Sequence, residues 1–237
     1  MKEQIYNLQS VANSSASDRA GFIRRTYAHL AVAILAFIAI EYYLVNSPFA
    51  ASLASSMTGG MSWLVVIGLF MGVSYIANKL AVSQTSQQMQ YLGLGLFVVA
   101  EAIVFLPLLY IATIYGGDGV IASAGMMTLL LVGGITATVF ITKKDFSFMG
   151  SFLSMGGFVA LGFILCSMIF GFSLGLIFAS VMVVFAGGAV LYSTSNVLHQ
   201  HSTDQHVAAA LSLFASVALL FFYILQVLMS LGGGGDD

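Results

Sequence analysis

The chain has 237 residues, of which 59% are apolar and only 7% are charged, and its formal net charge is −2. Because roughly a quarter of the residues of a soluble domain are charged, this chain cannot cover a water-exposed surface, and a soluble globular fold is excluded. The negative net charge speaks against nucleic acid as a partner, whereas the mean hydropathy of +1.01 predicts the lipid bilayer as the surrounding medium.

Seven stretches of the chain are long and apolar enough to cross a bilayer, which takes about 20 residues of helix. In chain order they are 26–45, 61–80, 91–114, 119–141, 151–170, 173–191 and 207–231. A polar segment, 1–25, precedes them and a Gly/Asp tail, 232–237, follows, so 26–231 is expected to form one membrane domain. The fifth and sixth stretches are separated only by Gly171–Ser173, which predicts a tight hairpin. The sequence therefore predicts an all-α integral membrane fold with seven transmembrane helices.

The basic residues predict the orientation of the bundle, because cytoplasmic loops of membrane proteins are enriched in Lys and Arg. With seven spans, all of them fall on the N-terminal side of the membrane: Lys2, Arg19, Arg24, Arg25, Lys79, Lys143 and Lys144. We therefore expect a cytoplasmic N-terminus, Lys79 at the membrane interface, and the tail on the other side. If the last stretch were only re-entrant, the tail would return to the cytoplasm.

Many of the 25 glycines lie inside the predicted spans, among them Gly68 and Gly72 in "GLFMG". Small residues let helix backbones approach closely in a membrane. The favoured interpretation is packing within the bundle, and a dimer face is the alternative.

The third stretch places an isolated acid in "VVAEAIVFLPLLY", residues 98–110. Glu101 lies about 15 Å along the helix from Tyr91, and so near the membrane midplane. An acid at that depth is costly and usually faces protein or water, so Glu101 is a candidate proton- or cation-sensing group. A neutral acid that only hydrogen-bonds a neighbour is the alternative. Pro107 deprives the carbonyl of Ile103 of its helical donor and predicts a kink.

Two further polar features are predicted to face water. Glu41 precedes Tyr42 and Tyr43 near the end of the first stretch. Tyrosines of this kind are typical of the membrane interface, so the Glu41 carboxylate is expected to reach water there. The segment 199–206 carries three His and one Asp. Their spacing matches no zinc motif, and a solvated loop is favoured over a pH-responsive one.

Patterns of enzymes and of cofactor sites are missing from the sequence. There is no G-x-S-x-G motif of a hydrolase and no G-x-x-x-x-G-K-[ST] phosphate loop. The single Cys166 can form no internal disulfide and has no His near it in sequence to activate it. We therefore expect no enzymatic activity, no cofactor and no bound metal.

Three stretches of the chain resemble the Bax inhibitor-1 family of multi-pass membrane proteins, and within it the bacterial YccA-like branch. They are "TKKDFSFMGSFLSMG" at 142–156, "GGAVLYSTSNVLHQHSTDQHVAAALSLFASVALLFFYIL" at 187–225, and "FIRRTYAHLAVAIL" at 22–35 with "FLPLLYIA" at 105–112. The resemblance implies a seven-helix bundle with the last helix central and six helices around it. It also implies a location in the bacterial inner membrane.

The resemblance also implies a site between the sixth and seventh helices. Family members are described as pH-sensitive calcium leak channels in which one acid from each of these helices shares a proton. Two close carboxyl groups cannot both ionise cheaply, so such a pair titrates near neutral pH. This chain has Ser193 in "LYSTSN" and Ser216 in "LFAS" at those places. Hydroxyl groups do not titrate near neutral pH and bind divalent cations poorly without carboxylates.

Two functions are therefore expected. The first is modulation of membrane-protein quality control, because the YccA-like branch is associated with the FtsH-type membrane protease, a possible partner of this chain. The alternative is a calcium or proton leak that uses Glu101 in place of the acid pair. The position of Glu101 distinguishes the two functions. The leak requires Glu101 to face the last helix near Ser216, and a position facing lipid would argue against it.

Overall fold

The computed structural model describes residues 11–59, 61–83 and 86–232, and its regular elements there are helices. Seven of these helices are long and apolar enough to cross a bilayer. They are α2 (Ala16–Val45), α4 (Met61–Ala81), α5 (Gln87–Tyr115), α6 (Val120–Thr142), α7 (Met149–Phe170), α8 (Gly175–His199) and α9 (His206–Gly232). The predicted all-α, multi-pass membrane fold is confirmed.

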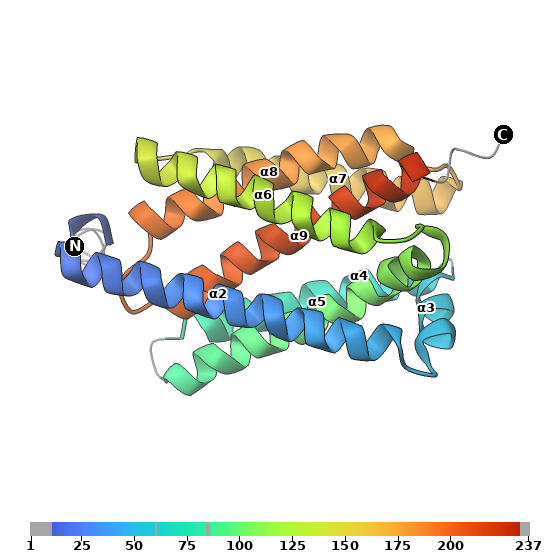
Figure 1. The fold of residues 1–237 in the computed structure, drawn as a ribbon, viewed down its shortest axis with the longest axis horizontal. Coiled ribbons are helices and arrows are strands. Elements are labelled where there is room, and N and C mark those ends of the chain that lie inside the picture. The colour runs from blue at the N-terminus through green and yellow to red at the C-terminus, as the bar shows by residue number, and fades with distance from the viewer. Residues whose placement is uncertain (1–10, 60, 84–85, 233–237) are drawn as a thin grey trace.

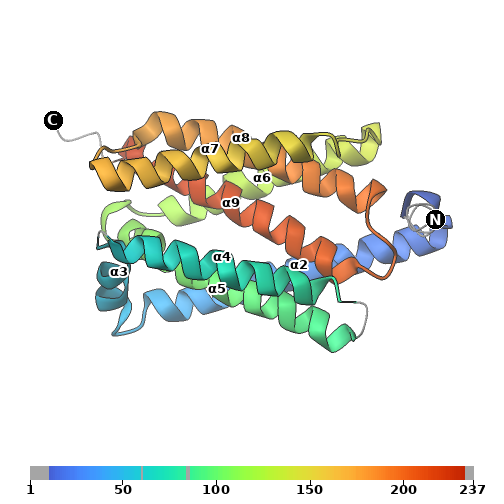
Figure 2. The ribbon, with the colours of Figure 1, turned by 180° about the vertical axis from the view of Figure 1, so that it is seen from behind.

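The last helix, α9, forms the centre of the bundle. It runs diagonally between α2, α4 and α5 on one side and α6, α7 and α8 on the other (Figures 1 and 2). In the most apolar part of α9, 72% of the residues are buried, against 22% or less in α2, α4, α6, α7 and α8. Apolar side chains that face outward on the other helices meet lipid, so only the central helix and its neighbour α5 are largely covered by protein.

Two short elements lie outside the predicted spans. The 3₁₀ turn η1 (Val11–Asn13) precedes α2, and α3 (Ala50–Thr58) fills the connection between α2 and α4. With nine residues, α3 is far too short to cross a bilayer. It buries Ala50, Ala54 and Met57 on one side, while its serine side chains bond the backbone of the preceding turn.

The first and sixth membrane helices are longer than the apolar runs from which they were predicted. Helix α2 begins at Ala16, within the polar segment, because the Ser15 side chain caps it by accepting the Asp18 amide at 3.2 Å. Helix α8 continues to His199 and carries the polar "STS" triplet, which lies beyond the predicted end at residue 191, into the bundle. By contrast, Pro107 lies buried within an unbroken α5, and the kink remains a prediction.

Glycine has two different uses in this bundle. Gly171, with φ 72°, ends α7 in the left-handed conformation and donates its amide to the Ser167 carbonyl, so the tight hairpin to α8 is confirmed. Gly93 of α5 brings two backbones together, because an added Cβ would lie 2.6 Å from the Ala77 carbonyl oxygen. An added Cβ at Gly68 or Gly72 would meet nothing within 4 Å, so the expectation that this pair packs inside the bundle is wrong.

Lys and Arg residues of the described chain gather at one end of the bundle, here called the basic end. It is the end at which α2, α5, α7 and α9 begin and α4, α6 and α8 finish (Figure 1). Lys79 lies exposed in the last turn of α4, where a cation complements the helix dipole. Lys2 and residues 233–237 of the tail lie outside the described residues.

Candidate functional site

The structure brings Ser193 of α8 and Ser216 of α9 into direct contact inside the bundle. Their hydroxyl oxygens are 2.7 Å apart, and the side chains are 4% and 7% exposed. Ser216 donates to the Ser212 carbonyl at 2.9 Å, and Ser212 donates its hydroxyl to Ser193 at 3.3 Å. Since each hydroxyl has one proton, Ser193 must donate to Ser216. The three protons are all used, so this is a closed network between α8 and α9.

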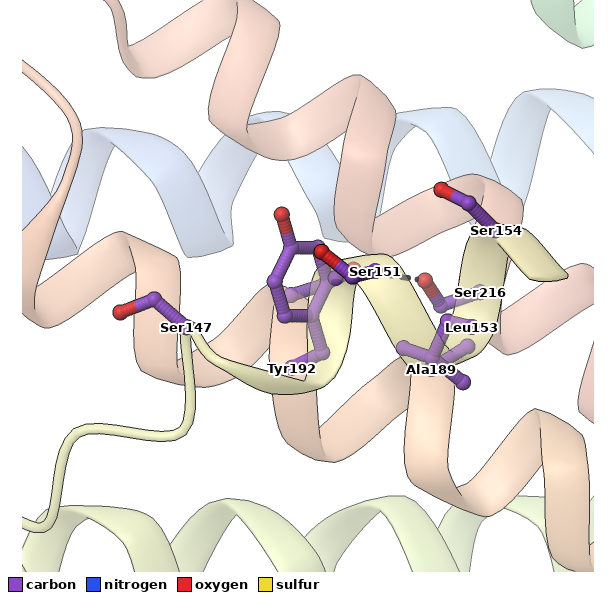
Figure 3. Close-up of a pocket in the computed structure, with 9 residues that line it drawn as sticks. Ser147, Ser151, Leu153, Ser154, Ala189, Tyr192 and Ser216 are labelled. Carbon is purple, nitrogen blue, oxygen red and sulfur yellow. Dashed lines mark hydrogen bonds between the residues drawn. The ribbon is translucent and has the colours of Figure 1, made fainter.

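A polar cavity of about 580 Å³ opens beside this pair, and we call it the serine cavity (Figure 3). Helix α7 forms its far wall. Gly150 of α7 lies close to the Tyr192 ring of α8 there, since an added Cβ would lie 2.8 Å from the Tyr192 hydroxyl. The lining residues are Ser147, Gly150, Ser151, Leu153, Ser154, Ala189, Tyr192, Ser193 and Ser216.

The loop before α7 is fixed to the end of α8 at the rim of this cavity. The Phe146 amide donates to the Ser195 hydroxyl at 2.8 Å, and the Gln200 side chain donates to the Ser147 hydroxyl at 3.0 Å. Ser147 in turn bonds Asp145 through its hydroxyl and its amide. These bonds stabilise the carboxylate and lower the pKa of Asp145 below its usual value.

Glu101 lines a second cavity, of about 760 Å³, which we call the Glu101 cavity. The Glu101 side chain is 7% exposed, and its Oε2 is buried without a hydrogen-bond partner. Across the cavity lie Leu219 and Tyr223 of α9. Leu219 is one turn beyond Ser216, so Glu101 faces the central helix and not the lipid.

The two cavities follow one another along the same seam between α7, α8 and α9, and the Glu101 cavity extends from it to α4 and α5. One face of α7 lines the serine cavity with Ser151 and Ser154 and the Glu101 cavity with Gly157 and Leu161, at the helical spacing of three and four residues. At their junction, the Phe185 ring of α8 packs onto α7, where an added Cβ at Gly156 would lie 2.7 Å away. Helix α7 packs against α8 and stands across these cavities from α9.

The Glu41 carboxylate does not reach water, and that prediction is wrong. Its side chain is 5% exposed, and neither carboxylate oxygen has a hydrogen-bond partner. Glu41 continues the buried stripe of α2 that includes Phe37, four residues earlier, and this spacing was a sequence signal that it faces inward. Its neighbours Tyr42 and Tyr43, each 74% exposed, are the ones that point outward.

Protein covers most of the loop between α8 and α9, where Gln200 and Asp204 are exposed, so the prediction of a solvated loop is wrong for the rest of it. Ser202 and Gln205 are buried, and the Val11 amide of η1 donates to the His201 carbonyl at 2.9 Å. The Phe22 ring lies 6.4 Å from the His201 ring. Burial is the main influence on His201 and lowers its pKa.

Arg19 holds η1 over this loop. Its guanidinium donates to the Val11 carbonyl at 3.1 Å and to the Ala12 carbonyl at 2.7 Å. Since Val11, Arg19 and Phe22 precede His201 by 179 residues or more, no local pattern could show that η1 and α2 cover the loop. In the described part of the chain, no three His, Cys, Asp or Glu side chains form a group that could hold a metal ion.

A bundle of seven long apolar helices around a buried central helix defines a multi-pass integral membrane protein. Residues 19–233 match the family model described as "Inhibitor of apoptosis-promoting Bax1". The chain belongs to the Bax inhibitor-1 family, as the sequence resemblance predicted.

Relatives from bacteria and eukaryotes agree with this assignment. The chain is 32% identical to an uncharacterized protein of Pseudomonas aeruginosa, with 100% of each chain covered. It is 29% identical to Protein LIFEGUARD 4 of Arabidopsis thaliana, over 88% of this chain and 84% of that protein. It is 28% identical to Bax inhibitor 1 of Schizosaccharomyces pombe, over 95% and 82%.

Proposed function

We propose that the protein is a non-enzymatic leak pathway for calcium or protons through the seam between α7, α8 and α9. The observation that carries the proposal is the position of Glu101, buried near mid-helix in a cavity that it shares with the central helix. Acids at membrane depth mark ion and proton pathways when they face a cavity. The serine cavity leads toward the same seam from the basic end.

Phe185 is the proposed constriction of this path. Its ring lines the Glu101 cavity and packs against Gly156, which lies on α7 between the residues that line the two cavities. An apolar constriction gates a pore by keeping it dry. The Ser193–Ser216 network is already complete and has no titratable group, so Glu101 is the group that would respond to pH in this chain.

The test is flux of calcium and of protons into liposomes that contain the purified protein. We expect flux above that of empty liposomes between about pH 6 and 8, a severalfold decrease in Glu101→Gln, and an increase in Phe185→Ala. Glu41→Gln is the matched control, because it neutralises the other buried acid, which lies outside the seam. Wild-type flux no greater than that of empty liposomes would disprove the leak.

A second candidate function is modulation of an FtsH-type membrane protease. The replacement of the acid pair by a closed serine network favours it, because this network cannot act as the family's proton switch. It is tested by co-purification with the protease from native membranes and by turnover of its membrane substrates after deletion of the gene. No association together with unchanged turnover would exclude it.

The proposed location is the inner membrane of a bacterium, with the N-terminus in the cytoplasm. The bacterial relative at 32% identity supports the first part. The basic end supports the second, since Arg19, Arg24, Arg25, Lys143 and Lys144 all lie beside it.

A further inference from the structure

A third cavity, of about 440 Å³, lies between α2, α5, α6 and α9, away from the seam, and we call it the Glu41 pocket. Its wall is almost wholly apolar, with Phe37 from α2, Leu109 from α5, and Phe214 and Phe221 from α9. Ligand sites in helix bundles have this size and character, with a few polar groups that fix the ligand.

Glu41 is the polar group of this pocket that lacks a partner. Three other polar residues of the wall bond the backbone of their own helices: Asn46 bonds the Tyr42 carbonyl, Thr113 the Tyr110 carbonyl and Thr128 the Ala124 carbonyl. Both carboxylate oxygens of Glu41 are buried without such a bond. A buried carboxyl group without a partner is costly, and an occupant that donates a hydrogen bond would remove that cost.

The shape of the pocket matches one leaflet of a bilayer. Along α2 it extends from Ile34 to Asn46, which is about 18 Å of helix and so somewhat more than half of a hydrocarbon core about 30 Å thick. Glu41 lies about 10.5 Å from the Ile34 end of this length and about 7.5 Å from the Asn46 end, and so in the half of the pocket nearer the end of α2. Ile38 and Leu129 line the pocket and are 55% and 59% exposed, so it is open sideways to lipid.

We propose that the Glu41 pocket binds one acyl chain of a membrane phospholipid whose headgroup carries a primary ammonium, with the ammonium directed to Glu41. The chain would lie along α2 against Phe37 and Phe214. The ammonium supplies both opposite charge and N–H donors to a carboxyl group that has neither. This site is separate from the proposed leak. The Glu41 pocket and the Glu101 cavity are both lined by α5 and α9, but no residue lines both of them.

Gly125 of α6 provides a way to fill the pocket. It lies in the wall, and an added Cβ there would meet no atom within 4 Å. Gly133, also on α6, has equally open surroundings but lies outside the pocket. Gly125→Leu and Gly133→Leu therefore make a matched pair, one that blocks the site and one that does not.

The test is native mass spectrometry of the protein taken from bilayers that contain equal amounts of phosphatidylethanolamine, phosphatidylcholine and phosphatidylglycerol with identical chains. Phosphatidylcholine has a cationic headgroup without N–H donors, so it separates hydrogen bonding from charge. We expect the wild type to retain phosphatidylethanolamine about tenfold more than phosphatidylcholine, as one charge-assisted hydrogen bond would give. Glu41→Gln should lose this preference, and Gly125→Leu should retain little of any lipid.

Gly133→Leu and Glu101→Gln should retain lipid as the wild type does, which keeps this result distinct from the flux measurement. Equal retention of phosphatidylethanolamine and phosphatidylcholine by the wild type, or an unchanged preference in Glu41→Gln, would overturn the proposal. Retention of no lipid by the wild type would overturn it as well. If Gly125→Leu does not fold, the comparison of the wild type with Glu41→Gln still decides.

Discussion

At the scale of single residues, the Ser193–Ser216 contact predicts an energetic coupling between α8 and α9. Ser216→Ala leaves the Ser193 proton without its acceptor and should lower the free energy of unfolding by about 1 kcal/mol. Ser193→Ala should have a similar effect, and the double variant should cost less than the sum by about 0.6 kcal/mol. Unfolding in detergent measures all three. Ser154→Ala, on the wall of the same cavity, is the control and should change little; strict additivity would show that the network contributes no coupling.

His201 predicts a dependence of stability on pH at the same scale. Burial lowers its pKa in the folded state, so the unfolded chain binds a proton more readily. The neutral form therefore contributes its full stability above the unfolded pKa of about 6.5. This stability is lost as the pH falls from there toward the folded pKa. The unfolding midpoint should decrease on acidification, and His201→Gln should reduce that decrease. An identical pH profile for the variant would show that His201 carries no such linkage.

At the scale of elements, the contact between α4 and α5 predicts opposite effects at two nearby glycines. An added Cβ at Gly93 would lie 2.6 Å from the Ala77 carbonyl oxygen and 2.7 Å from the Ala81 amide, and these backbone atoms cannot move cheaply. Gly93→Ala should therefore destabilise the protein by about 1–3 kcal/mol. Gly95→Ala, where nothing lies within 4 Å, should instead stabilise α5 by about 0.5–1 kcal/mol. Thermal unfolding of both variants checks the sign, and a neutral Gly93→Ala would mean that the two helices are less tightly packed.

The elements also show how far the sequence could predict this molecule. Apolar runs located all seven membrane helices, because lipid-facing and buried positions of such helices are both apolar. They could not show that α8 continues through Ser193, since a serine that bonds a neighbouring helix has the same hydropathy as one in water. The position of Glu41 was readable from its four-residue spacing after Phe37, and the tyrosines beside it obscured that signal. The cavities exist because α7 is separated from α9. The residue pattern of a single helix does not show how far it lies from another helix.

At the scale of the whole molecule, the basic end predicts the orientation in the membrane. In the described chain, cationic side chains cluster where α2 begins and around Lys143 and Lys144, whereas Asp118 lies in the connection at the opposite end. Retention of basic loops in the cytoplasm therefore predicts that Asp118 faces the outside.

Cysteine labelling in intact cells tests this orientation. The native Cys166 is exposed and is first replaced by serine. In that background, a membrane-impermeant maleimide should label Asp118→Cys and should label Lys144→Cys only after the cells are opened, because both positions are exposed but lie on opposite sides of the bilayer. The reverse pattern would place the basic end outside. In that case the serine cavity, which opens at the Ser147 rim, would face the exterior, and the Glu41 pocket would take its lipid from the cytoplasmic leaflet. The labelling of these two positions therefore shows whether the serine cavity opens to the cytoplasm or to the exterior. It also shows which leaflet supplies lipid to the Glu41 pocket.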